Sequence, residues 1–227
     1  MTRRPLALTV ALIAATGLSA CSLMPGGSGG QPQQPRRSQG NLAANPAARQ
    51  CLAQLGSAGA HFTPLPDRYI STGCTNLNTV QLSALQSDRS SIAIGNIGPA
   101  TCGVSQAFAG WVRYGADRAA RQILGSPLRS VETFGSYSCR NVAGTNRRSA
   151  HSTADAIDVS AFVLQDGRRI SVKGDWSDGT SAERRFLRVA HESACKRFDT
   201  VLGPEYNAAH RDHFHVEGVI SGTSYCR

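Results

Sequence analysis

The stretch "AIDVSAFVL" at residues 156–164 is followed by "QDG" at residues 165–167 and "RRISV" at residues 168–172. Both apolar runs carry Val and Ile, which favour extended backbone. An Asp-Gly pair between two such runs supplies the tight turn of an antiparallel hairpin. The sequence therefore predicts two paired strands at residues 156–172.

The first strand of this hairpin carries a carboxylate. Side chains alternate between the two faces of a strand, and this alternation predicts a core-facing side made of Ile157, Val159 and Ala161. Asp158 then lies on the opposite face, where the small residues Ala156 and Ser160 leave room around its carboxylate.

Apolar residues recur at helical spacing in several other segments. Helices are expected at residues 47–56, 79–87, 105–124 and 181–198, the last with Ser181 as its N-cap. Further strands are expected at residues 130–139, 200–203 and 213–220. The predicted fold class is α+β, with a mostly antiparallel sheet and helices packed on it.

The beginning of the chain has the pattern of an export signal. Residues 1–20 combine two early arginines with an apolar run that is short for a membrane span, so we expect a signal peptide. The letters "LSAC" ending at Cys21 resemble the lipobox of bacterial lipoproteins. This resemblance implies that Cys21 is lipidated and anchors the protein to a membrane on its periplasmic face. Ser22 favours the outer over the inner membrane, and a soluble export signal cleaved elsewhere is the alternative.

Two regions of different composition follow. Residues 21–48 hold the lipidated cysteine and a segment dominated by Gly, Pro, Gln and Ser, which predicts a flexible tether. Residues 49–227 are long enough for one domain with a sizeable core, and we expect this domain to be a monomer. The formal net charge is +9, which favours anionic wall polymers or phospholipid head groups as neighbours. Export and the absence of a basic helix argue against nucleic acid.

The cysteines are expected to be structural. An even number remains after Cys21, and in an exported domain this predicts three disulfides with open connectivity. No C-x-x-C pair occurs, so a cysteine zinc knuckle is not expected. The six residues are Cys51, Cys74, Cys102, Cys139, Cys195 and Cys226.

Two dense polar segments could supply a metal site. "SAHSTADAID" occupies residues 149–158 and "AAHRDHFHVE" occupies residues 208–217. A catalytic zinc site needs three protein ligands and one open position, and histidine is the commonest metal ligand. From the residues alone, His151 could equally be a loop residue and Asp158 could equally pair with an arginine.

The first segment resembles the S-x-H-x-x-G-x-A-x-D signature of the LAS zinc peptidases, with Ala154 in place of the usual glycine. The later "HFH" is similar to their H-x-H motif. The resemblance implies that His151, Asp158 and His215 bind Zn²⁺ and that peptidoglycan peptides are the substrate. "SYSCR" resembles the family's Tyr-Arg segment, which implies a substrate-holding role for Arg140, although the spacing to His151 is unusually short.

The general base has two candidates. LAS peptidases often place an acidic residue three positions before the last ligand, which points to Asp212. Strand alternation turns Asp212 away from the ligand face, so His210 is its rival. His213 is expected to steady the oxyanion or the substrate.

Most of the domain, from about residue 51 to residue 227, is similar to the bacterial extensin-like C-terminal domain. "GSYSCRNV", "DGRRISV", "VLGPEYNAAHRDHFH" and the final "YCR" carry this resemblance. Together with the LAS motifs it implies an exported zinc peptidase that remodels the cell wall. The alternatives are a non-catalytic wall-binding lipoprotein that keeps the fold, and a zinc hydrolase with another exported substrate.

Overall fold

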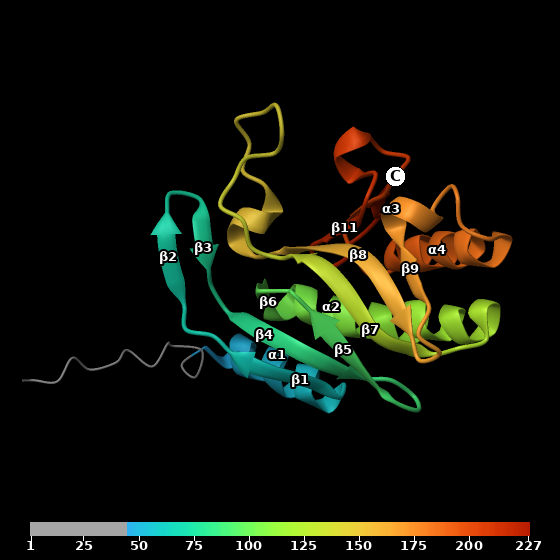
Figure 1. Cartoon of the computed structure of the whole chain (residues 1–227). Coiled ribbons are helices and arrows are strands. Elements are labelled where there is room, and N and C mark those ends of the chain that lie inside the picture. Colours follow the sequence, from blue (N-terminus) through green and yellow to red (C-terminus); the bar gives the residue numbers. More distant parts are fainter. Residues whose placement is uncertain (1–44) are drawn as a thin grey trace, which may run out of the picture. The chain divides into compact units, whose positions relative to one another are not determined.

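The predicted hairpin is present at the centre of a large sheet. The computed structural model describes residues 45–227, and Figure 1 shows their arrangement. Strand β8 (Ala156–Leu164) pairs antiparallel with β9 (Arg169–Ser171), as the Asp-Gly turn predicts. β8 also pairs with β7 (Leu128–Gly135) and with β11 (Phe214–Glu217), so it is an interior strand.

The alternation along β8 changes partway. Its register against β7 shifts between Glu132 and Thr133, which pair with Ala161 and Val159 respectively, so Ser160 is the extra residue of a β-bulge. Ile157 and Val159 face the core as predicted, but Phe162 follows them there and Ala161 does not belong to the core cluster. The bulge therefore leaves Asp158 on the predicted face and corrects the prediction beyond it.

The large sheet has ten strands and is mostly antiparallel, with parallel pairs only at β5–β7 and β10–β12 among the described residues. Its order is β1-β4-β5-β7-β8-β11-β10-β12, with β6 on β4 and β9 on β8. The strands not yet located are β1 (Ala60–Pro64), β4 (Thr79–Gln86), β5 (Ser91–Gly95), β6 (Pro99–Thr101), β10 (Thr200–Leu202) and β12 (Tyr225–Cys226). A separate hairpin joins β2 (Arg68–Ser71) to β3 (Cys74–Asn76).

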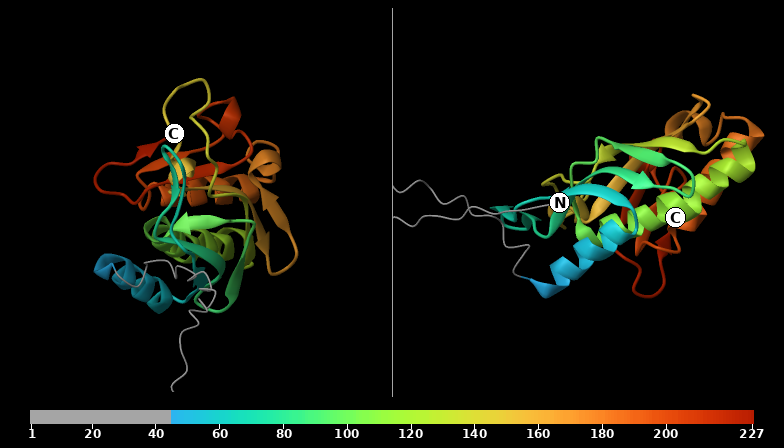
Figure 2. Two further views of the ribbon diagram at one scale, coloured as in Figure 1. Left: turned by 90° about the vertical axis from the view of Figure 1, so that its left-hand side faces the viewer. Right: turned by 90° about the horizontal axis from the view of Figure 1, so that it is seen from below.

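Helices cover one face of this sheet (Figures 1 and 2). The main helical run is continuous and ends at Gly125, whose φ of 75° suits glycine. The helices are α1 (Pro46–Ser57), α2 (Cys102–Trp111) continued by the π-helical η2 (Val112–Asp117) and η3 (Ala120–Leu124), then α3 (Val172–Asp175) and α4 (Ser181–Ala194). Short 3₁₀ turns are η4 (Ala150–Thr153) and η5 (Ala208–His210).

Aromatic rings join the helices to the sheet. Trp111 of α2 contacts Phe162 of β8, and Phe162 contacts Phe186 of α4, with centroids 6.0 and 5.2 Å apart. The indole N–H of Trp111 donates to the carbonyl of Ala190 at 2.9 Å, so burial leaves it satisfied. Phe214 of β11 also contacts Phe162, so this packing supports β8 and β11 on their core-facing side.

The structure confirms the α+β class and corrects several elements. Residues 79–87 were predicted as a helix, but Thr79–Gln86 form β4. The N-cap of α4 is Thr180 and not Ser181, because Thr180 and Glu183 form a reciprocal capping box. Six further strands lie where no strand was predicted: β1, β2, β3, β5, β6 and β12.

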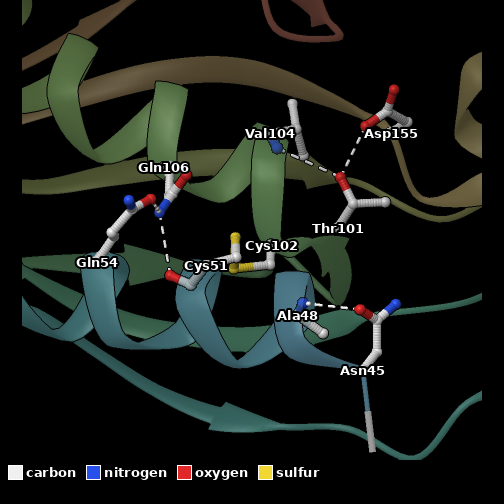
Figure 3. The surroundings of a disulfide bond; sticks show 9 residues. All are labelled: Asn45, Ala48, Cys51, Gln54, Thr101, Cys102, Val104, Gln106 and Asp155. Atoms are coloured by element: carbon white, nitrogen blue, oxygen red, sulfur yellow. Dashed lines mark hydrogen bonds between the residues drawn. A yellow bond between two sulfur atoms is a disulfide. The ribbon is translucent and has the colours of Figure 1, made fainter. Parts of the chain in front are cut away.

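The six cysteines that were predicted to be bonded form three disulfides: Cys51–Cys102, Cys74–Cys139 and Cys195–Cys226. Figure 3 shows the first, which joins α1 to the start of α2. Beside it, Thr101 caps α2 by accepting from the backbone N–H of Val104 and donates its hydroxyl to Asp155 at 2.7 Å. The third disulfide ties the last strand to the end of α4.

The predicted signal peptide at residues 1–20, the predicted lipidation site at Cys21 and nearly all of the predicted tether lie outside the described residues. The first described helix, α1, begins at Pro46, slightly before the predicted domain start at residue 49. Within residues 45–227, no helix is both long and apolar enough to cross a membrane.

Candidate metal centre

Two of the three predicted ligands lie on neighbouring strands. His215 of β11 is directly opposite Asp158 of β8 in the antiparallel register. Phe214 and Val216 belong to the core cluster, so the alternation along β11 turns His215 to the other face, where Asp158 also lies. The distance from His215 Nδ1 to Asp158 Oδ1 is 2.9 Å.

The third residue comes from the short turn before β8. His151 belongs to η4, whose N-cap Ser149 accepts from the backbone N–H of His151. Ala154 ends this turn with φ at 58°, in the left-handed region that glycine enters without strain. This position therefore has a backbone conformation that favours glycine, and here alanine adopts it.

The three side chains converge on one point, where His151 and His215 are buried and the side chain of Asp158 is 13% exposed. His151 Nε2 lies 3.2 Å from Asp158 Oδ1 and 3.1 Å from His215 Nδ1. One ligand atom from each residue falls within 4.8 Å of the other two. The structure thus brings together the set predicted from two segments far apart in the sequence, and these residues could hold a metal ion.

Outer partners determine which nitrogen of each ring points inward. His151 Nδ1 is 2.7 Å from the carbonyl oxygen of Ser136, which can only accept, so Nδ1 carries the hydrogen. His215 Nε2 is 3.0 Å from a carboxylate oxygen of Glu217, which favours a hydrogen on Nε2. In the neutral rings both inward nitrogens then present lone pairs toward each other and toward Asp158. Three acceptors without a donor are the arrangement that a cation satisfies, and metal-bound histidines commonly have such outer partners.

In the metal-free chain a proton takes the place of that cation. Burial on its own would lower the pKa of His215, but its hydrogen bonds to Asp158 and Glu217 raise it to about 9. Burial likewise opposes ionisation of Asp158, yet its interactions with His151 and His215 hold the pKa of this carboxyl far below its usual range. The cluster therefore keeps a carboxylate and attracts positive charge.

The other predicted residues lie around this cluster. His213 precedes β11 and directs Nε2 toward Asp158 Oδ1 at 3.4 Å, while its Nδ1 is 2.9 Å from Asp212 Oδ1. Asp212 therefore reaches the cluster through His213. His210 hydrogen-bonds to Asn207 and lies with its ring 5.2 Å from that of His213.

Electrostatics distinguish His210 from its neighbours. Burial, followed by the charges of His213 and His215, lowers the pKa of His210 to about 4. Arg140 also contributes to this lowering, so its charge acts within the site. Its backbone carbonyl accepts from the N–H of Ser149, which ties the segment before η4 to the turn that carries His151.

Sequence reasoning missed three members of the site. The Ser136 carbonyl belongs to the backbone, and no side-chain pattern marks it. Strand alternation does place Glu217 on the same face as His215, but no role as its hydrogen-bond partner was predicted. Phe134, which is 57% exposed, places its ring 5.9 Å from that of His213, a contact between segments that no local pattern predicts.

A second group of potential ligands, His191, Cys195 and Cys226, is also within ligand distance. Both of its sulfur atoms are consumed by the Cys195–Cys226 disulfide, so in this form it is not a metal site.

The fold and the cluster define a disulfide-bonded α+β domain with a candidate two-histidine, one-carboxylate metal site at the junction of β8 and β11. Comparison with protein families assigns the chain more narrowly. The family model described as extensin-like protein C-terminus matches residues 49–227, and the chain belongs to this family. No curated protein and no solved structure matches it.

Proposed function

We propose that this protein is a zinc-dependent peptidase that cleaves peptidoglycan peptides during cell-wall remodelling. The observation that carries the proposal is the convergence of His151 Nε2, His215 Nδ1 and Asp158 with outer partners that keep both histidine lone pairs inward. The resemblance of the surrounding segments to the LAS peptidases supports the same reaction class.

Zinc suits this set of donors. Two imidazoles and one carboxylate are a donor combination found in catalytic zinc sites, which leave a fourth position open. A zinc ion bound there would polarise a peptide carbonyl and lower the pKa of a bound water toward neutrality. His151, Asp158 and His215 would hold the ion.

The Asp212–His213 pair is suited to proton transfer. Asp212 holds Nδ1 of His213, so His213 Nε2 faces the cluster with a lone pair in the neutral ring. We assign His213 Nε2 as the group that accepts a proton from the attacking water and returns it to the leaving amine as the C–N bond breaks. Asp212, favoured as the base by sequence spacing, then orients this ring and stabilises its charged form.

Arg140 and His210 are assigned to the substrate. Arg140 would offset the negative charge that develops on the carbonyl oxygen. His210, whose low pKa keeps it neutral at physiological pH, can donate or accept a hydrogen bond without adding charge. Neither assignment requires the residue to move a proton.

The test is cleavage of purified peptidoglycan fragments by the chain produced in an oxidising compartment. We expect about one zinc per chain, new amino termini detected by mass spectrometry, loss of cleavage with a chelator, and recovery on adding zinc. Stoichiometric zinc in an Asp158→Ala, His215→Ala variant would contradict the metal assignment. Zinc-loaded protein that binds fragments and leaves them intact would favour the non-catalytic wall-binding alternative.

The cellular setting is part of the proposal. An exported lipoprotein, anchored through Cys21 and facing the periplasm, would meet peptidoglycan within reach of its tether. The three disulfides agree with an oxidising compartment. Labelling with a radioactive fatty acid, compared between wild type and Cys21→Ala, tests the anchor.

A further inference from the structure

Two hollows lie beside the candidate metal centre and share part of their lining. One has a volume of about 700 Å³ and the other about 390 Å³, and both are lined by Lys173 and Asp212. Asp212 is bonded to His213, whose Nε2 faces Asp158. The shared wall therefore lies one side chain away from the cluster, within reach of a substrate bound there.

Internal ion pairs neutralise two of the arginines that line these hollows. Arg169 is bound to Glu132 at 2.6 Å. Arg188 is bound to Glu205 at 2.9 Å, and its guanidinium stacks over Trp176 at 4.2 Å. Because these arginines already pair with carboxylates of the protein, their role is to form the walls of the hollows.

Lys173 and Arg211 are different. Both line the larger hollow and both are exposed. Within residues 45–227, neither the ammonium of Lys173 nor the guanidinium of Arg211 forms a hydrogen bond or ion pair. Two cations without internal partners, in a hollow next to a hydrolytic centre, are suited to bind a negatively charged group of a ligand.

The acids in the same hollow restrict the charge of that ligand. Asp178 also lines it and has no ion pair among the described side chains. A densely charged polyanion such as a phosphate polymer would be repelled by Asp178 and Asp212. A peptide with single, separated carboxylates would not, because one carboxylate can face the cations while amide N–H groups face the acids.

The smaller hollow adds an apolar surface. Phe134 lines it, is 57% exposed and forms a T-shaped contact with the ring of His213. An apolar ring beside a cation suits a peptide that carries a small aliphatic side chain close to a carboxylate.

We infer that the two hollows form a substrate groove in which Lys173 and Arg211 recognise a carboxylate of the peptide next to the bond that is cleaved. This inference rests on the proposed function and adds to it a specificity for free carboxylates. Peptides with amidated carboxyl groups should then be poor substrates, although their scissile bond is unchanged.

The experiment compares native muropeptides with the same muropeptides amidated by ammonia and carbodiimide. KM and kcat are measured for four zinc-loaded proteins: wild type, Lys173→Met, Arg211→Met and the control Lys196→Met. Lys196 is an exposed lysine just after α4. We expect KM for native peptide to rise about tenfold in the two groove variants, as loss of one charge-assisted contact predicts, with kcat little changed. Amidated peptide should give the same high KM in all four proteins.

Binding to zinc-free protein, measured by calorimetry, separates this inference from the proposed reaction. Wild type that binds or cleaves both peptide forms equally well would overturn the groove assignment and leave the peptidase proposal standing. Preference for native peptide without cleavage by the zinc-loaded protein would support the groove and contradict the reaction. A KM increase in Lys196→Met equal to that in Lys173→Met would also refute the inference.

Discussion

Replacing Glu217 with glutamine tests the architecture of the candidate metal centre. Glu217 accepts from His215 Nε2 at 3.0 Å and so keeps the lone pair of Nδ1 directed at Asp158. The glutamine side chain would keep the shape but could donate its amide hydrogen to Nε2, which shifts the hydrogen to Nδ1 and blocks metal binding. Loss of such an outer partner typically costs about 10- to 100-fold in metal affinity.

The same substitution should also increase the apparent zinc affinity, because it weakens the competition between zinc and a proton on His215. Glu217 is one of the two partners that raise the pKa of His215 to about 9 in the metal-free chain. Below that pH a proton must leave before zinc binds, so the apparent zinc affinity of wild type should rise about tenfold per pH unit up to about pH 9. Without Glu217 the pKa of His215 falls, proton competition weakens, and the rise with pH should level off earlier.

Near pH 7 the changed tautomer and the weaker proton competition have opposite effects on zinc affinity. Above pH 9 proton competition disappears, so only the effect of the tautomer remains. We expect Glu217→Gln and wild type to bind zinc with similar apparent affinity near pH 7, and wild type to bind about 10- to 100-fold more tightly above pH 9. Competition with a chromophoric chelator from pH 6 to 9.5 measures this, and Glu192→Gln on the exposed side of α4 is the control. Superimposable pH profiles of Glu217→Gln and wild type would refute the tautomer argument.

Three further predictions concern other parts of the site. Replacing both Cys74 and Cys139 with serine should weaken zinc binding, because this disulfide anchors the segment whose Ser136 carbonyl orients His151. Removing the Cys51–Cys102 disulfide should instead lower the melting temperature and have less effect on zinc affinity. Replacing Ala154 by glycine should leave stability within about 1 kcal/mol of wild type, while valine should lower it by at least that amount because φ is 58° and the site is buried; urea titration measures both. Asp212→Asn should keep zinc and lose about 100-fold in kcat, and His210→Ala should mainly raise KM; a normal kcat in zinc-loaded Asp212→Asn would exclude its pair with His213 from catalysis.

The sequence predicted the fold class and the central hairpin, but it missed several short strands, and its wrong helix at residues 79–87 falls where a bulge interrupts a strand. In β4, Val80 and Leu82 follow strand alternation, but the register against β1 skips Ser83, so the next core residue is Leu85. The resulting spacing of two and then three residues imitates one face of a helix, which explains the wrong prediction for residues 79–87.

The candidate site was more predictable than the fold around it. The resemblance to the LAS motifs pointed to His151, Asp158 and His215, which lie together in the structure. Strand alternation by itself places Asp158 and His215 on their strand faces but does not identify them as ligands. The pairing of Asp212 with His213 was not predictable from alternation, because β11 begins at Phe214 and these residues precede the strand.

His215 and Asp158 lie opposite each other on two paired strands, so the site forms only when these strands are in the correct register. These residues are 57 positions apart in the chain, and a slip of one residue would bring Phe214 or Val216 to Asp158. The ion would therefore bind only after the two strands have paired correctly, and would then stabilise that alignment by mass action. If the chain is exported unfolded, as proposed above, it carries no such site during transit and would acquire its metal in the compartment in which it folds.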